Sequence, residues 1–290
     1  MKLLFKFNLV FLLLFMVAIG ACYFISRNLL LRNANDEIDE NARLMMSNAL
    51  AVRAYTVKQI KPLLETQMKY TFLPQTVPAY AATEVVNDLR QKYPEYAYKE
   101  AMLNPTNPRD RAVDWEADLI NQFRNGTASG EISGQRDTPN GKSLYLAKPL
   151  KIADPACLLC HSTVEIAPRT MVDKYGPANG FGWNLNEVVG AQVVSVPTAV
   201  PLARAQHALK TFMASLAGVL VGIGLILNLV LYWMFVRPVT RISKLADRVS
   251  LGELDAPDID IRSGDEIQTL AESLARMRKS MAQALQLLGG

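Results

Sequence analysis

The run Cys157-Leu158-Leu159-Cys160-His161 carries residue types that could do chemistry together. Two cysteines separated by two residues can bond to both vinyl groups of a haem, and a histidine directly after them is placed to bind the iron. The run contains two of the three cysteines in the chain and one of its two histidines. It therefore predicts one covalently attached c-type haem per chain, held by Cys157 and Cys160, with His161 as an axial ligand of the iron.

Three other interpretations of these cysteines compete with haem. A disulfide would suit an oxidising compartment, but a bridge across two residues closes a tiny loop and stabilises little. A thioredoxin-like pair should follow a strand and open a helix, whereas Ala153-Asp154-Pro155 before this pair has the composition of a loop. Zinc would need a fourth ligand, and His207 lies at the mouth of an apolar segment. Haem is the interpretation that also explains His161.

The second axial position of the iron has several candidates. Met45 lies on the apolar face of a predicted helix with Met46 one step further round, and a thioether ligand would raise the reduction potential of the iron. Methionines at helical spacing also fill cores, so both could be packing residues. His207 could reach the iron if its helix bends back. With none of these bound, the position would be open to a gas.

Arginines are candidate partners for the propionates of a haem. A guanidinium group can bind a carboxylate through two parallel hydrogen bonds, which makes Arg53, Arg109 and Arg111 candidates. Arginines near loops are also commonly solvated. Trp183 could pack on the face of the haem or belong to an ordinary core.

Two long uncharged segments must anchor these residues to a membrane. The chain has 290 residues, of which 50% are apolar and 20% charged, with a mean hydropathy of +0.09. Residues 7–26 and 211–236 contain no Asp, Glu, Lys or Arg, and each segment is long enough to cross about 30 Å of hydrocarbon as a helix. This pattern excludes a soluble enzyme and a multi-span transporter, and a net charge of +4 gives no basic patch for nucleic acid.

Charges at the ends of the spans predict the orientation. Lys2 and Lys6 precede the first span, and Arg237 and Arg241 follow the second, so both termini should be cytoplasmic. The segment between the spans would lie in the periplasm of a bacterium, anchored to the inner membrane, where c-type haem is attached. Cleavage before Cys22, as in a lipoprotein, is the alternative for the first span. The expected divisions are a cytoplasmic N-terminus (1–6), a first span (7–26), an extracytoplasmic domain (27–210), a second span (211–236) and a cytoplasmic tail (237–290).

Helices and a small antiparallel sheet are expected between the spans. Apolar residues at helical spacing predict a long helix from residue 33 to residue 60 that continues the first span, and shorter helices at 83–92 and 113–123. Strands are predicted at 130–136 and 143–150, joined by the turn Asp137-Thr138-Pro139-Asn140-Gly141, and at 190–196. The fold class is therefore α+β.

The tail has the pattern of a helical bundle. Ile242, Leu245 and Val249 form one short apolar stripe, and a connector from residue 252 to residue 263 follows. A second stripe keeps three-four spacing, which is typical of a coiled-coil seam; its members are Ile267, Leu270, Leu274, Met277, Met281, Ala284 and Leu288.

Two family resemblances follow from these motifs. The tail, with Arg237-Pro238 at the membrane exit and Gly264-Asp265-Glu266-Ile267 at its second helix, resembles a HAMP linker, which implies a dimeric four-helix bundle. Residues 33–200 resemble membrane-tethered, PAS-like c-type haem sensor domains, which implies a PAS-like sheet holding one haem and a sensory role. The segments that carry this second resemblance are Tyr98-Lys99, Asn104-Pro105-Thr106-Asn107-Pro108, Trp115-Glu116, Tyr145-Leu146, Cys157 to His161, Gly180-Phe181-Gly182-Trp183 and Val189-Gly190-Ala191.

The functional prediction is a homodimeric receptor that is not an enzyme. Its haem would sense redox state, through a redox partner, or a small diatomic ligand, and the change would pass through the second span to the HAMP linker. A separate cytoplasmic partner of the kinase, cyclase or chemotaxis type would give the output, and no nucleic acid is involved. The alternatives are a membrane-anchored electron-transfer cytochrome, for which the tail would have no role, and a thiol oxidoreductase, which needs free cysteines.

Overall fold

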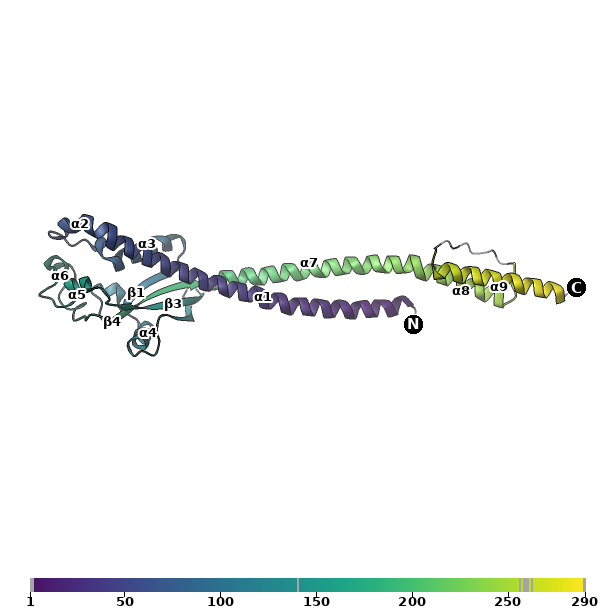
Figure 1. Ribbon diagram of the computed structural model, residues 1–290, viewed down its shortest axis with the longest axis horizontal. Helices are drawn as coiled ribbons and strands as arrows, with labels where there is room; N and C mark the ends of the chain where they lie inside the picture. Colours follow the sequence, from purple (N-terminus) through teal and green to yellow (C-terminus); the bar gives the residue numbers. More distant parts are fainter. Residues whose placement is uncertain (1–2, 140, 256, 258–260, 262, 289–290) are drawn as a thin grey trace. The chain divides into compact units, whose positions relative to one another are not determined.

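A computed structural model describes residues 3–139, 141–255, 257, 261 and 263–288 of the chain (Figure 1). The chain separates into two compact units, which are Leu29–His207 and the combination of Met1–Asn28 with Ala208–Gly290. Each unit is considered by itself below.

A long N-terminal helix runs through the first span and into the unit Leu29–His207. Helix α1 covers Leu3–Tyr55, and the backbone then widens into a π-helix, η1 (Thr56–Ile60), before α2 (Lys61–Met68). The hydroxyl of Thr56 donates to the carbonyl oxygen of Val52 at 2.8 Å, at the start of the widened turn. The predicted helix through residue 60 is thus α-helical up to Tyr55, and the π-helix begins at Thr56.

The rest of this unit alternates short helices with four strands. Two predicted helices are confirmed, and the first of them begins earlier than predicted because Pro78 starts it. The elements are η2 (Pro74–Thr76), α3 (Pro78–Lys92), β1 (Ala97–Met102), η3 (Pro108–Asp110), α4 (Asp114–Arg124), β2 (Ile132–Thr138), β3 (Gly141–Lys151), η4 (Pro155–Cys157), α5 (Leu158–His161), α6 (Arg169–Tyr175) and β4 (Val188–Pro197).

The four strands form one antiparallel sheet in the order β1-β4-β3-β2. The predicted hairpin is β2 with β3, whose innermost described pair is Thr138 with Gly141; Asn140 of the predicted turn lies outside the described residues. The predicted third strand is β4, which pairs with both β1 and β3. Strand β1 was not predicted. It forms one edge of the sheet, and the Asn-Pro loop follows it in the sequence. The expected α+β class is confirmed.

Helices cover both faces of the sheet, because neighbouring residues on each strand point to opposite sides. Helices α1 and α3 bury one face, where Leu146 and Val194 lie at the centre of a core cluster. Helix α4 buries the other face, where Ala147 and Val193 pack against it. The α1 side of the first cluster consists of Ile38, Ala42, Met45, Met46 and Ala49.

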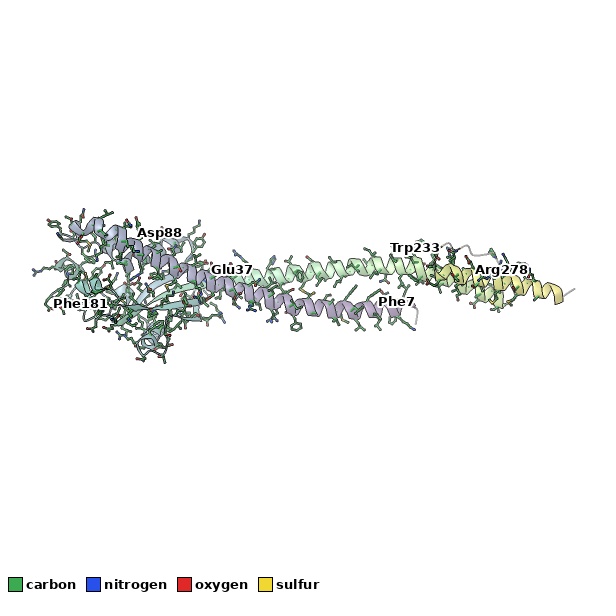
Figure 2. All side chains as sticks on the ribbon, viewed as in Figure 1. Phe7, Glu37, Asp88, Phe181, Trp233 and Arg278 are labelled. Carbon is green, nitrogen blue, oxygen red and sulfur yellow. The ribbon has the colours of Figure 1, made fainter. Side chains whose placement is uncertain are left out.

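The other unit contains the two candidate spans. Two helical stretches, one at the N-terminal end and one beginning at Ala199, are long and apolar enough to cross a membrane, judged by length and composition. Helix α7 (Ala199–Leu231) leads into a π-helix, η5 (Tyr232–Val236). Phe7 and Trp233 have exposed aromatic side chains (Figure 2). The side-chain amide of Asn228 donates to that of Asn8 at 2.7 Å, linking the two spans.

The tail forms two helices, α8 (Arg237–Ser250) and α9 (Glu266–Leu288). The predicted stripe of α8 is buried against Ile267, Ala271 and Leu274 of α9. Leu270, which was predicted to lie on the same seam, is instead 50% exposed, as are Met277 and Met281 to a similar degree. The row that faces α8 therefore shares Ile267 and Leu274 with the predicted seam but has Ala271 in place of Leu270. The side chain of Leu288 lies outside the described residues.

Candidate functional site

One turn of helix brings the three residues of the cysteine-histidine motif together. The side chain of Asp154 accepts a hydrogen bond from the backbone N–H of Ala156 at 2.8 Å, which starts the 3-10 turn η4. Helix α5 continues directly from Cys157 to His161. As a result Cys157, Cys160 and His161 all line one cavity.

The imidazole of His161 is held by one hydrogen bond and one ring contact. Its Nδ1 lies 2.8 Å from the carbonyl oxygen of Gly180, and its ring stacks on Trp183 with centroids 3.9 Å apart. A carbonyl oxygen only accepts hydrogen bonds, so Nδ1 carries the proton and Nε2 keeps a free lone pair. Burial lowers the pKa of His161, against a smaller opposing effect of the Gly180 carbonyl. The ring is therefore neutral near pH 7, which is the form that binds a metal.

Gly180 can hold His161 in this way because it has no side chain. Its φ is +85°, and a Cβ there would lie 1.9 Å from the hydroxyl oxygen of Thr106. That hydroxyl also lies 3.4 Å from Nδ1 of His161. The Asn-Pro loop and the Gly180 segment therefore meet beside His161, so both belong to the surroundings of the motif.

The cysteines do not have the character of activated nucleophiles. Burial raises the pKa of the Cys157 thiol, and the carboxylate of Asp154 raises it further, while Arg53 and Lys61 act in the opposite direction. Burial also raises the pKa of Cys160. Thiol oxidoreductases depend on a lowered cysteine pKa. The surroundings of this pair therefore favour its use in covalent attachment over thiol exchange.

The cavity has a volume of about 270 Å³, just below the usual range for small-molecule sites. The motif and Trp183 form one side. Helices η1 and α2 contribute Val57, Lys61 and Met68, and in Figure 1 α2 lies across from α5 and α6. The remaining lining is mainly apolar and comes from the segment around η2, the end of β1 with its loop, and α6; it includes Phe72, Pro74, Thr76, Val77, Pro78, Ala79, Tyr80, Met102, Pro105, Thr106, Asn107, Asp110, Met171 and Tyr175.

Neither Met45 nor Met46 lines this cavity. Both side chains are buried in the core cluster between α1, α3 and the sheet, where Met46 is 1% exposed. The structure therefore gives them the packing role and does not bring them to His161. His207, the other candidate, lies within α7 and also does not line the cavity.

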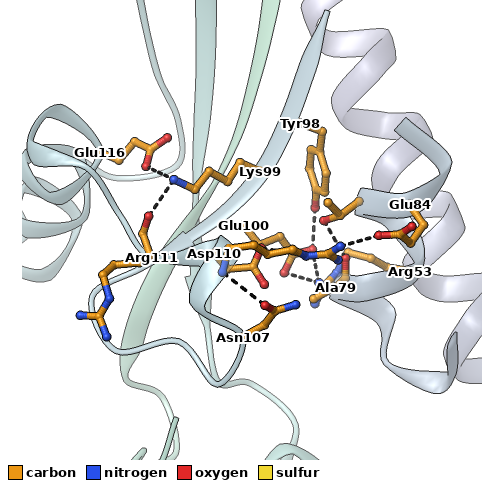
Figure 3. A network of polar contacts seen from close by, with 12 residues as sticks. Arg53, Ala79, Glu84, Tyr98, Lys99, Glu100, Asn107, Asp110, Arg111 and Glu116 are labelled. Atoms are coloured by element: carbon orange, nitrogen blue, oxygen red, sulfur yellow. Dashed lines mark hydrogen bonds and ion pairs between the residues drawn. The ribbon is translucent and has the colours of Figure 1, made fainter. Parts of the chain in front are cut away.

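Arg53 is the centre of a buried polar network (Figure 3). Its guanidinium forms an ion pair with Glu100 of β1, whose side chain is 1% exposed. The hydroxyl of Tyr98 donates to the same carboxylate at 2.7 Å, and the side-chain amide of Gln192 donates to Tyr98 at 3.3 Å. In this structure Arg53 is therefore engaged by a protein carboxylate.

The other two candidate arginines also have protein partners. Arg109 forms an ion pair with Glu84 and lies over the ring of Tyr80, 4.6 Å from its centroid. Arg111 is exposed, and its side chain lies 3.4 Å from the amide oxygen of Asn179. Neither arginine lines the cavity. Of the basic side chains that the structure describes, Lys61 is the one in the lining.

Two charged residues of the cavity, Asp110 and Lys61, were missed from the sequence. Asp110 has a side chain that is 13% exposed and lies 3.6 Å from the Nε of Arg109. Burial raises its pKa to about 6, and Glu100 adds to the effect, while Arg109 and Lys99 oppose it. Lys61 follows the π-helix directly. Asp110 belongs to the loop after Asn107-Pro108, which is the one sequence signal that could have found it.

Comparison with known proteins identifies two domains in the chain. Residues 31–197 match the Tll0287-like family, described as Tll0287, and residues 230–283 match the HAMP domain. A search of solved structures finds the crystal structure of the cyanobacterial heme-protein Tll0287, with 13% identity, a TM-score of 0.37, and coverage of 58% of this chain and 92% of that chain. No curated protein matches.

The first match covers more than half of the chain and contains the motif, the Gly180 segment and the whole sheet. The predicted HAMP domain is confirmed by the second match. The protein therefore belongs to the Tll0287-like family, with a HAMP domain after its second apolar helix.

Proposed function

We propose that this protein is a membrane-anchored haem sensor that passes a redox or diatomic-gas signal to its HAMP domain. The single observation that carries the proposal is the state of His161 in the cavity. Its Nδ1–H donates a hydrogen bond to the carbonyl oxygen of Gly180, so the lone pair of Nε2 is left free in the cavity that two thiols also line. An oriented neutral imidazole beside two paired cysteines is the donor set of a c-type haem.

The residues present fit this cofactor. Cys157 and Cys160 would each form a thioether bond to a vinyl group, and His161 would bind the iron. Trp183 keeps the imidazole ring in one orientation. Lys61, which lines the cavity, supplies a positive charge suited to a propionate, in place of the three arginines that are paired elsewhere. Haem supplies an iron that can change oxidation state or bind a diatomic ligand. Membership of the Tll0287-like family supports the assignment, because the protein Tll0287 is described as a heme-protein.

The proposed sensor has both termini in the cytoplasm and its haem domain in the periplasm of a bacterium. Support for this comes from the basic residues that flank the spans, and from the HAMP domain that follows the second span. It works as a homodimer, one haem per chain, and acts on a separate cytoplasmic partner of the kinase, cyclase or chemotaxis type. No catalytic role is assigned to the chain.

Haem staining of the full-length protein after denaturing electrophoresis tests the attachment. The wild-type band should stain, because a thioether bond survives denaturation. The double variant Cys157→Ala, Cys160→Ala should lose the stain completely. Cys22→Ala is the matched control and should stain like the wild type. An unstained wild-type band, or a stained double variant, would contradict the proposal.

A further inference from the structure

The cavity is also lined by a thioether side chain from helix α2, which lies across from the cysteine-histidine motif. We propose that the thioether sulfur of Met68 is the second axial ligand of the iron, on the opposite side from His161. This inference rests on the proposed haem function and deepens it, because it decides whether the iron is closed or open to ligands.

The position of Met68 supports this role. Met68 is the last residue of α2 and lines the same cavity as His161. Helix α2 lies across from α5, which carries His161 (Figure 1). A planar group bonded to Cys157 and Cys160 would therefore have α5 on one side and α2 on the other. Axial ligands of a haem come from opposite faces, as this placement allows.

The sulfur of Met68 is held in place by a neighbouring hydroxyl. Thr76, which is 2% exposed, has its Oγ1 3.0 Å from the Sδ of Met68 and 2.7 Å from the carbonyl oxygen of Leu73. A hydroxyl has one proton to donate. Whether that proton goes to Leu73 or to Met68, the sulfur keeps at least one lone pair for a metal. Thr76 thus restrains a flexible side chain without using up its donor capacity.

The other methionines of the cavity are less suited to this position. Met171 is 3% exposed and packs with Phe72 in the cluster that also contacts Cys160, so it lies beside the motif. Met102 lies along the sheet, where its Cγ is 2.8 Å from the place a Cβ on Gly190 would take. Both side chains belong to packing on the sheet or the motif side. Met68 is the methionine contributed by the facing helix.

Ligation by Met68 would give the sensor a closed, six-coordinate iron. A diatomic ligand would then have to displace the sulfur, which breaks one iron–sulfur bond as the new bond forms and leaves the oxidation state unchanged. Met68 lies at the end of the helical stretch that begins in the first span and passes through the π-helix. Its binding or release would act on that stretch directly.

The visible spectrum of the purified full-length holoprotein tests the inference. The oxidised wild type should show the weak sulfur-to-iron charge-transfer band at the red end of the spectrum, and Met68→Leu should lose it. The reduced Met68→Leu protein should also bind carbon monoxide at least tenfold more tightly than the wild type. Leucine is close to methionine in volume, so the fold should be retained.

Met102→Leu and Met171→Leu are matched controls and should keep the band. Loss of the band in either control but not in Met68→Leu would overturn the inference, as would a wild-type holoprotein without the band. In both cases the haem would still be covalently attached, so the proposed function would stand. A wild-type protein without haem stain would instead contradict the proposed function itself.

Discussion

The ring of His161 is fixed by two groups from one other segment of the chain, residues 180–183. The carbonyl oxygen of Gly180 accepts a hydrogen bond from Nδ1–H, and Trp183 stacks on the ring. A hydrogen bond to the second nitrogen of a ligating imidazole sets its tautomer and raises its basicity. The Gly180 carbonyl can approach only because that residue is glycine, with Thr106 where a side chain would be. The residues that orient His161 therefore characterise this site as much as the motif itself does.

Asp110 predicts a pH dependence of stability. Burial raises its pKa to about 6, above the ordinary 3.8, so between these values the folded protein binds a proton that the unfolded chain has lost. The contribution of Asp110 to stability is therefore present below pH 4 and is lost as the pH rises through 6. Asp110→Asn should gain up to about 3 kcal/mol relative to the wild type between pH 4 and pH 7.

Chemical unfolding in detergent, followed by circular dichroism at several pH values, measures this difference. Asp88→Asn is the control, because Asp88 is an exposed carboxylate on α3 (Figure 2). Its difference from the wild type should not change with pH. A pH-independent difference for Asp110→Asn as well would show that its carboxylate is ionised like an exposed one.

At the scale of elements, one buried ion pair joins the long helix to the sheet. Arg53 lies in the last turn of α1, and its partner Glu100 lies at the middle of β1 (Figure 3). Removing one partner of a buried pair leaves an uncompensated charge, which costs about 3–5 kcal/mol. The pair also lies near Cys157, whose pKa Arg53 affects. It therefore connects the membrane-proximal helix to the wall of the cavity.

Arg53→Met should lower the free energy of unfolding by about 3–5 kcal/mol, because among the described residues the Glu100 carboxylate then keeps only the hydroxyl of Tyr98 as a partner. Adding Glu100→Gln should recover much of that loss, since the buried charge is then gone. Arg43→Met, on the exposed side of the same helix, should change stability little. Equal losses in Arg53→Met and Arg43→Met, measured by the same unfolding assay, would refute the role of the buried pair.

The same pair explains why β1 could not be predicted. The segment Ala97–Met102 contains Lys99 and Glu100, so it has no alternation of apolar and polar residues. Glu100 can be buried because its counter-charge comes from a residue 47 positions earlier in the chain. The hairpin of β2 and β3 was predictable from the turn residues between its strands, and β4 was predictable from its run of apolar residues before Pro197. A long-range ion pair has no local pattern in the sequence.

The residues of the cavity also divide into those that the sequence indicated and those that it did not. The motif, its adjacent glycine segment and the Asn-Pro loop are visible in the sequence, and they meet at His161. The apolar stripe of α1 predicted that Met45 is buried, but it could not tell whether the stripe faces the sheet or the cavity. The π-helix also left no signal, and it is what places Val57 and Lys61 at the cavity.

At the scale of the whole molecule, the tail leaves one apolar row of α9 exposed, which a second copy of the chain would cover in the proposed dimer. Helix α9 packs Ile267 and Leu274 against α8, while Leu270 stays 50% exposed. The predicted seam mixed these two rows, because a four-helix bundle buries both, and the sequence does not say which faces the partner. In the proposed dimer Leu270 lies at the subunit interface. Glu272, on the same helix, has a side chain that is 56% exposed and faces solvent.

The most direct test of haem sensing is the rate of crosslinking at Leu270 in the membrane-bound holoprotein. With Cys22 replaced by serine, Leu270→Cys should react with a bismaleimide to give covalent dimers at least tenfold faster than Glu272→Cys. A HAMP bundle shifts between two packings when a stimulus favours one of them. The rate at Leu270→Cys should therefore differ between the oxidised, reduced and carbon monoxide-bound haem. Fast crosslinking at one unchanged rate in all three states would contradict a sensor and identify a tethered dimeric cytochrome.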